Sequence, residues 1–389
     1  MNLDKACHRR SSSVSPVVLG GLVAVAVFAG LFVSVTGSPP SAMADPPSIQ
    51  IPSEMTPEFV NSIDRGLTYL ANTQRDDGSW VVGGGYRQYS VVFTSIAGLS
   101  FLASGSTPES GPYSRNVARA MNYVLSHADP ETGLIATNST SRSMYDHGFG
   151  MLFLAQCYGM ELTEAKEKQL HKALTLGVGL IARSQSDLGS GLGHAGGWYY
   201  TPEARSDEGS VTVTQLQALR ACRNVGIAVP KDTIDRAVGY LKHCQMADGG
   251  ICYSASSATY SGGSRPPISA AALTCFYASG YYDRQAGGVG DEARMVERLW
   301  AYCDPLIVVS VDQGDTWGHY YYGHLYYGQA MYMRGGRQWD EYYAKFAASL
   351  VRSQNLDGSW SGGTGTAYRT AIATLIMQLP YGYLPICQR

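Results

Sequence analysis

The chain has 389 residues, of which 45% are hydrophobic and only 15% carry a formal charge. This composition supplies enough apolar side chains for a large core and excludes a wholly disordered chain. The formal net charge at pH 7 is −2. Because there is no excess of basic residues to neutralise a phosphate backbone, we expect no nucleic-acid partner.

The N-terminal segment has the pattern of a targeting signal. Basic residues within the first ten positions precede an apolar run over residues 17–35, and Ala42-Met43-Ala44 follows as a small-residue cleavage site. We expect residues 1–44 to be a signal peptide, although the run is long enough for an uncleaved signal anchor. Both alternatives export the rest of the chain to the periplasm or the extracellular side and allow membrane contact through this segment alone. Residues 45–57 are expected to be a linker.

One pattern recurs six times along the rest of the chain. It consists of a basic residue, Leu, Gln and finally Gly-x-Trp, and the copies over residues 65–80 and 345–360 are the clearest. A middle copy over residues 236–251 ends in Ile where Trp is expected. Weaker copies begin near Arg119, Lys172 and Arg298. Self-similarity at a fixed period indicates stacked supersecondary units.

Each copy has the pattern of a helical hairpin. In the first copy, Ile63, Leu67 and Leu70 recur at helical spacing and indicate an amphipathic helix, which is followed by a turn at Asp77-Gly78. The next segment, residues 91–102, is apolar nearly all round, as expected of a helix buried on both sides. Six outer and six inner helices of this kind predict an all-α fold, an (α/α)6 toroid that forms one domain over residues 58–389.

The repeat resembles a known family. Its form, Arg/Lys-Gly/Ala-x2-aromatic-Leu-x3-Gln-x3-Gly-x-Trp, is similar to the QW repeat of the squalene cyclase, terpenoid cyclase and protein prenyltransferase superfamily. The segments 196–200 and 381–385 are similar to exported bacterial repeat proteins without an assigned reaction. The resemblance implies the (α/α)6 toroid, in which Gln and Trp tie one helix pair to the next. A repeat of this kind implies no chemistry by itself.

The catalytic signatures of that superfamily are missing from the sequence. A class II terpene cyclase needs a D-x-D-D cluster, because a strong acid requires one carboxyl held protonated beside another. Asp76-Asp77 belongs to the repeat turn, and the segment 312–315 is only a broken echo of the motif. A prenyltransferase needs an Asp-x-Cys pair among its zinc ligands, whereas Asp207-Glu208-Gly209 has no thiol. We expect no metal and no cofactor.

The candidate site lies where the inner helices begin, since these ends surround one mouth of a toroid. Asp146, His147, Asp207 and His324 are the candidate acid and base groups. Candidate ligand-binding residues are Tyr145, Trp198, His319, Tyr322 and Arg369. His194, in a glycine-rich loop, is a further residue that can approach a ligand.

A structural role remains open for each of these residues. Asp146 at a helix start is typical of an N-cap, whereas the functional alternative makes His147 a general base. His319 and His324 are five residues apart and lie on different helix faces, which disfavours a shared metal site. For Arg369 the sequence favours an ion pair with a neighbouring carboxylate.

Two functional classes remain open. In the first, the protein is an enzyme whose aromatic cavity holds an apolar or sugar-like small-molecule or polymer ligand and acts on it through the Asp and His candidates. In the second, the toroid is a non-catalytic scaffold or binding protein of the cell envelope. Loss of the family's catalytic motifs favours the second class, and the clustered Asp and His residues favour the first.

Seven cysteines remain after removal of the leader. An odd number in an exported protein leaves at least one thiol unpaired or paired between chains. Cys244 and Cys252 flank the Asp248-Gly249-Gly250 turn, and the sequence allows a disulfide if the turn brings them together. Cys157, Cys222 and Cys275 lie near the ends of apolar helices, where a buried inert thiol is expected.

Overall fold

The computed structural model describes residues 51–80, 88–138, 140–160, 162–187, 196–204, 206–255, 263–309 and 319–388. These ranges contain twelve α-helices and no β-strand. The helices are α1 (Pro57–Thr73), α2 (Ser90–Ala103), α3 (Ser114–Ser126), α4 (Ser143–Cys157), α5 (Glu164–Ser184), α6 (Gly209–Asn224), α7 (Lys231–His243), α9 (Pro266–Ala278), α10 (Gly290–Cys303), α11 (Tyr320–Arg334), α12 (Gly336–Ser353) and α13 (Thr366–Met377). Two short 3-10 helices follow, η4 (Leu379–Tyr381) and η5 (Pro385–Cys387).

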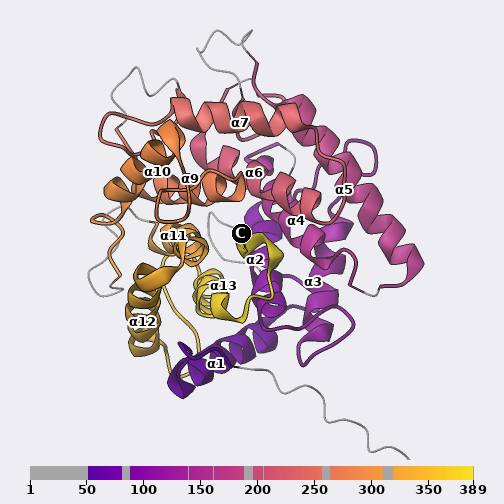
Figure 1. Ribbon diagram of the computed structural model, residues 1–389. Helices are drawn as coiled ribbons and strands as arrows, with labels where there is room; N and C mark the ends of the chain where they lie inside the picture. Colours follow the sequence, from indigo (N-terminus) through magenta and orange to yellow (C-terminus); the bar gives the residue numbers. More distant parts are fainter. Residues whose placement is uncertain are drawn as a thin grey trace, which may run out of the picture. The chain divides into compact units, whose positions relative to one another are not determined.

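The helices form two concentric rings (Figure 1). The inner ring contains α2, α4, α6, α9, α11 and α13, each packed against the next, and α13 packs back against α2. The helices α1, α3, α5, α7, α10 and α12 lie outside and alternate with the inner ones along the chain. This arrangement confirms the predicted (α/α)6 toroid.

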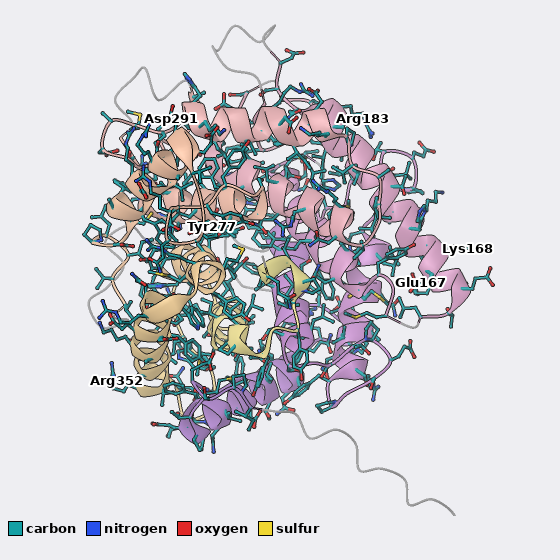
Figure 2. All side chains as sticks on the ribbon, in the orientation of Figure 1. Glu167, Lys168, Arg183, Tyr277, Asp291 and Arg352 are labelled. Atoms are coloured by element: carbon teal, nitrogen blue, oxygen red, sulfur yellow. The ribbon has the colours of Figure 1, made fainter. Side chains whose placement is uncertain are left out.

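The sequence pattern explains which helix takes which place. Every residue of α2 is buried, as expected for a helix that is apolar nearly all round. Helix α1 buries only one face, which includes Ile63, Leu67 and Leu70. Figure 2 shows charged side chains such as Lys168 and Arg352 pointing away from the outer helices, whereas Tyr277 of α9 lies inside.

In three of the described repeats an indole hydrogen bond holds the outer helix to the turn that follows it. The indole Nε1 of Trp80 donates to the carbonyl of Leu70 at 3.0 Å, and that of Trp360 donates to the carbonyl of Leu350 at 2.9 Å. Trp198 makes the same bond to the Ile181 carbonyl at 2.8 Å. Each indole is thus buried with its donor satisfied.

The repeat glutamine joins one repeat to the next. The Nε2 group of Gln74 donates to the carbonyls of Gly78, in its own turn, and Asn116, in the next outer helix. Gln354 of the last repeat makes the corresponding bonds to Gly358 and to Ser62 in α1. The ring is therefore closed by the same contact that joins its neighbours.

The C-terminal segment covers one end of the ring. Helix η5 packs against α6 and α11, Tyr383 lies against Gly105 just after α2, and Gln378 donates to the Ser100 carbonyl. These contacts lie at the C-terminal ends of the inner helices, and Figure 1 shows the segment over the middle of the ring. Any central cavity must therefore open at the N-terminal ends.

The packed unit begins before the expected boundary at residue 58. Met55, placed by the sequence analysis in a linker, is buried and belongs to the core. The predicted leader, His194 and the end of the repeat copy that begins near Arg298, with Trp317, lie outside the described residues. Within the described part, no helix is long and apolar enough to cross a membrane.

The turn glycine is the most sensitive point of the repeat network. Gly358 has φ +88°, and a Cβ atom there would collide with the Arg65 carbonyl oxygen of the first repeat. We expect Gly358→Ala to lower the free energy of unfolding by about 2 kcal/mol or more, since it adds backbone strain to a close contact. Urea unfolding followed by circular dichroism measures the change.

Gly363 provides the matched control for this variant. It lies in the same connection, and an added Cβ would meet no atom within 4 Å. Gly363→Ala should change the free energy of unfolding by no more than about 0.5 kcal/mol. Equal losses in the two variants would contradict the role given to the Gly358 contact.

Candidate functional site

A central cavity of about 420 Å³ opens at the N-terminal ends of the inner helices. Its volume lies within the range of about 300–1,000 Å³ that is usual for ligand sites. All six inner helices or the residues just before them contribute to its wall. The lining residues are Tyr89, Val92, Phe93, Arg142, Tyr145, Phe149, Tyr200, Glu208, Ser210, Tyr253, Arg265, Pro267, Ile268, His319, Tyr322, Thr364 and Tyr368.

The N-cap residues of five inner helices face this cavity. They are Tyr89, Arg142, Glu208, Arg265 and His319. In an α-helix the peptide dipoles sum to a partial positive charge at the N-terminus. The ring geometry therefore points several helix N-termini at one space, and the potential there favours negative charge.

Two arginines add full positive charges at the rim. The guanidinium of Arg142 stacks over the Tyr200 ring at 4.5 Å and hydrogen-bonds to Tyr89. Arg142 has φ +52° and, among the described residues, is the one non-glycine residue with positive φ. Such strained conformations occur preferentially at functional sites. Arg265 is exposed beside the same mouth.

Glu208 supplies the one carboxyl group among the residues that line the cavity. It caps α6 by accepting a hydrogen bond from the Val211 N–H at 2.8 Å, and Ser210 and Tyr145 donate their hydroxyls to it at 2.7 and 3.2 Å. Burial raises the pKa of the Glu208 carboxyl above its usual value, although these hydrogen bonds act in the opposite direction. Glu208 therefore keeps its proton to a higher pH than a free glutamate.

Tyr145, His319 and Tyr322 line the cavity, as the sequence analysis expected of ligand-binding residues. The Tyr145 hydroxyl is 2.6 Å from Ser210 Oγ as well as close to Glu208. His319 is exposed at the rim, and Tyr322 forms part of the wall. These three residues come from α4 and from the start of α11, which the ring brings to a common space.

Asp146 faces away from this space. Its two carboxylate oxygens accept hydrogen bonds from the backbone N–H groups of Val92 at 3.1 Å and Thr137 at 2.7 Å. Asp146 therefore caps the neighbouring helix α2. Its own helix α4 has Arg142 as N-cap residue, and the Arg142 side chain makes no capping hydrogen bond. Burial raises the pKa of Asp146 to about 6.

His147 is a structural member of the repeat. Its Nδ1 accepts a hydrogen bond from the Ile135 N–H at 3.1 Å, and its Nε2 lies 3.3 Å from the Gly177 carbonyl. In two other repeats a threonine hydroxyl accepts the equivalent backbone hydrogen bond. Thr94 accepts from the N–H of Trp80, and Thr212 accepts from the N–H of Trp198. The side chain is fully buried, so His147, the candidate general base, does not reach the space at the helix starts.

Asp207 and His324 are likewise buried behind the wall. Asp207 Oδ1 accepts hydrogen bonds from the Tyr240 hydroxyl and the Ala255 N–H, both at 2.8 Å. His324 Nε2 lies 3.0 Å from the Val308 carbonyl, and its Nδ1 lies 3.0 Å from the Tyr342 hydroxyl. None of the four Asp and His candidates lines the cavity, because their polar atoms bond to the surrounding fold.

Trp198 and Arg369 also lie outside the cavity lining. Trp198 is the buried indole of a repeat. Arg369 donates to the Thr364 hydroxyl and the Ser361 carbonyl, each at 3.2 Å, and stacks over the Tyr321 ring. The expected pairing of Arg369 with a carboxylate is replaced by these neutral acceptors and the aromatic face.

Glu208, Arg142 and Arg265 line the cavity but were not among the residues predicted from the sequence. Each stands directly before an apolar inner helix, so the N-cap position was the signal that would have identified them. Within the described ranges, no cluster of three or more His, Cys, Asp or Glu side chains could hold a metal ion.

The buried histidines make stability depend on pH. Burial lowers the pKa of His147 to about 4 from 6.5, so the unfolded chain takes up a proton as the pH falls from about 6.5 to 4 while the folded chain does not. The stabilisation is therefore present above pH 6.5 and is lost on acidification, by about 3 kcal/mol for this residue.

His147→Thr keeps an acceptor for the Ile135 N–H and removes the titrating group. We expect its free energy of unfolding to fall less steeply than that of the wild type between pH 6.5 and 4, in urea titrations at several pH values. The raised pKa of Asp146 acts with the opposite sign in both proteins. A wild-type slope in His147→Thr would contradict the prediction.

Solved structures with the same fold are found by structural comparison. No protein-family profile matches the chain, and no curated protein matches its sequence. Among solved structures, a family 76 glycoside hydrolase from a bovine Bacteroides thetaiotaomicron strain has a TM-score of 0.61 at 8% identity, covering 85% of this chain and 79% of that one.

Two further structures cover 84% of this chain and 99% of their own length. The GH76A α-1,6-mannanase from Salegentibacter sp. HEL1_6 has a TM-score of 0.57 at 10% identity. The type II terpene cyclase MstE from Scytonema has a TM-score of 0.51 at 14% identity. Since these likenesses are structural and the identities are low, they establish that the chain shares the (α/α)6 toroid fold with terpene cyclases and family 76 mannanases.

Proposed function

We propose that this protein binds, in its central cavity, a ligand with an apolar or sugar-like body and an anionic group. The observation that carries the proposal is the meeting of helix N-termini and two arginines around one aromatic cavity of about 420 Å³. The targeting pattern of residues 1–44 supports a place for this activity outside the cytoplasm.

The anionic group is inferred from the charges at the rim. Arg142 and Arg265 lie at the N-termini of α4 and α9, so their charges add to the positive ends of two helix dipoles. Glu208 is the one opposing carboxyl group of the lining, and its raised pKa reduces its negative charge. A carboxylate, sulfate or phosphate at the rim would therefore find a favourable potential.

The body of the ligand is inferred from the walls. Phe93, Phe149 and Ile268 supply apolar surface, and the tyrosines supply ring faces that carry hydroxyl groups. Aromatic faces of this kind pack against hydrocarbon and against the apolar faces of sugar rings. The C-terminal segment covers the opposite end of the ring, so we expect the ligand to enter past the arginines.

A charged fluorescent probe tests this assignment. 1-Anilinonaphthalene-8-sulfonate carries an aromatic body and a sulfonate, and N-phenyl-1-naphthylamine has the same body without the charge. We expect saturable binding of the sulfonate, weakened about tenfold or more in Arg142→Ala/Arg265→Ala, because each lost charge-assisted contact costs about 1–2 kcal/mol. Fluorescence titration measures both affinities.

The uncharged probe should bind the wild type and the double variant with similar affinity. Arg223→Ala removes an exposed arginine at the C-terminal end of α6 and should leave the sulfonate affinity unchanged. Equal affinity of the sulfonate for the wild type and the double variant would refute the anionic subsite. Failure of both probes to bind would refute an accessible cavity.

Acid catalysis by Glu208 is a second candidate function. The observation that favours it is a carboxyl group in the cavity wall whose pKa is raised by burial and whose hydrogen-bond partner is the Tyr145 hydroxyl. A carboxylic acid whose pKa is raised keeps its proton to a higher pH than a free one and can protonate a bound ligand. This role replaces the one expected of the Asp and His candidates, which face away from the cavity.

Because the acid form is needed, turnover should decline as the pH rises through the raised pKa of Glu208. Glu208→Gln preserves an acceptor for the Val211 N–H, and we expect it to fold normally and to lose turnover about a hundredfold or more. Glycoside hydrolysis is the reaction class to test first, because one structural neighbour is an α-1,6-mannanase. Cleavage of α-1,6-mannotetraose, followed by chromatography, is a direct assay for it. No cleavage by the wild type would exclude that class, and equal cleavage by both proteins would exclude Glu208 as the acid.

A further inference from the structure

Two cysteine thiols meet beside the turn of the middle repeat. Cys244 is the C-cap of α7, and Cys252 lies on the other side of the turn. The Cys252 N–H donates to the Cys244 carbonyl at 3.0 Å, and Gln245 and Ile251 form an antiparallel bridge. This pairing sets the two cysteines opposite each other. The Cys252 Sγ donates to the Ser254 carbonyl at 3.1 Å, and each of the two thiols shifts the pKa of the other.

Of the described cysteines, only Cys244 and Cys252 shift each other's pKa. The other mature cysteines are buried at separate places in the helices and near the C-terminus, and no second thiol affects their ionisation. They are Cys157, Cys222, Cys275, Cys303 and Cys387. The odd cysteine count therefore resolves into one close pair and five isolated thiols.

We propose that Cys244 and Cys252 are joined by a disulfide bond in the mature protein. The backbone hydrogen bond at 3.0 Å holds the two residues on facing sides of one turn. A disulfide needs Cβ atoms about 3.5–4.5 Å apart, so closing the bond draws the two sides of the turn together. The predicted leader agrees with this, since exported proteins fold in oxidising compartments.

The bond forms by thiol-disulfide exchange. One thiolate attacks an exchange-active disulfide, such as that of a thiol-disulfide oxidoreductase or oxidised glutathione, and releases one thiol from it. The second cysteine then attacks the mixed disulfide and releases the other thiol. The two cysteines lose two protons and two electrons, and the exchange disulfide is reduced to two thiols. Because both sulfurs are fully buried in the native fold, the exchange takes place during folding.

The bond would fix part of the cavity wall. The Tyr253 carbonyl, next to Cys252, accepts the N–H of Gly209 at the start of α6 at 2.8 Å. On the other side, the Ile251 carbonyl accepts the N–H of Arg265 at the start of α9, also at 2.8 Å. A crosslink at Cys252 therefore anchors the short segment that carries Tyr253 and positions the Arg265 backbone.

Differential alkylation of the wild-type chain tests the bond directly. The full chain is produced in bacteria with an oxidising cytoplasm, so that the result does not depend on export, and is unfolded in guanidinium with iodoacetamide. It is then reduced, labelled with N-ethylmaleimide and digested for mass spectrometry. We expect maleimide on Cys244 and Cys252 and carbamidomethyl groups on the five isolated cysteines and on Cys7 of the N-terminal segment.

Thermal unfolding with and without a phosphine reductant gives a second measurement. The closed loop is short, so we expect the reductant to lower the wild-type Tm by a few degrees. The double variant Cys244→Ser/Cys252→Ser should show no response. Cys275→Ser, which removes an isolated thiol, should respond as the wild type does.

Carbamidomethyl groups on Cys244 and Cys252 before reduction would overturn the proposal, as would maleimide found instead on another cysteine pair. The labelling uses the wild type, so it remains decisive if a serine variant fails to fold. Loss of probe binding to the cavity would not affect this result, because the alkylation pattern does not depend on the ligand.

Discussion

A single side-chain amide, repeated around the ring, holds this toroid together. Gln74, Gln185, Gln245 and Gln354 each donate from Nε2 to the carbonyl of the turn glycine or its neighbour and to a carbonyl of the next outer helix. An amide nitrogen has two hydrogens, and both are used on backbone acceptors that would otherwise be buried without a partner. The last glutamine reaches the first helix, so the contact that joins neighbours also closes the ring.

This closure decides where the central cavity opens. Because the inner helices alternate regularly with the outer ones, their N-termini meet at one end of the ring, and the C-terminal segment covers the other. The partial positive charges of the helix ends and the rim arginines therefore face one cavity. The aromatic wall below them is apolar with polar edges, which suits an amphipathic ligand better than a strongly charged one.

Neighbouring polar residues at the helix starts have different roles because their side chains point in different directions. Tyr145, Asp146 and His147 are consecutive, and successive positions on a helix differ by about 100°. Tyr145 therefore faces the cavity, Asp146 faces α2 and His147 faces the outer layer. Glu208 follows Asp207 in extended backbone, where adjacent side chains point to opposite sides, so the former lines the cavity and the latter is buried behind it.

The sequence by itself determined the toroid and its helical hairpins, because the period of the pattern and the apolar inner helices are local properties. It also placed Tyr145, His319 and Tyr322 at helix starts, which are readable from the pattern. The end at which the cavity opens depends on the C-terminal segment that covers the other end. Only the tertiary structure decided that Asp146, His147, Asp207 and His324 bond to the surrounding fold and that Glu208, Arg142 and Arg265 line the cavity. The physical reason is that a side chain's direction and its hydrogen-bond partner depend on how far each helix is rotated against its neighbours, and that rotation is set by packing between residues distant in the chain.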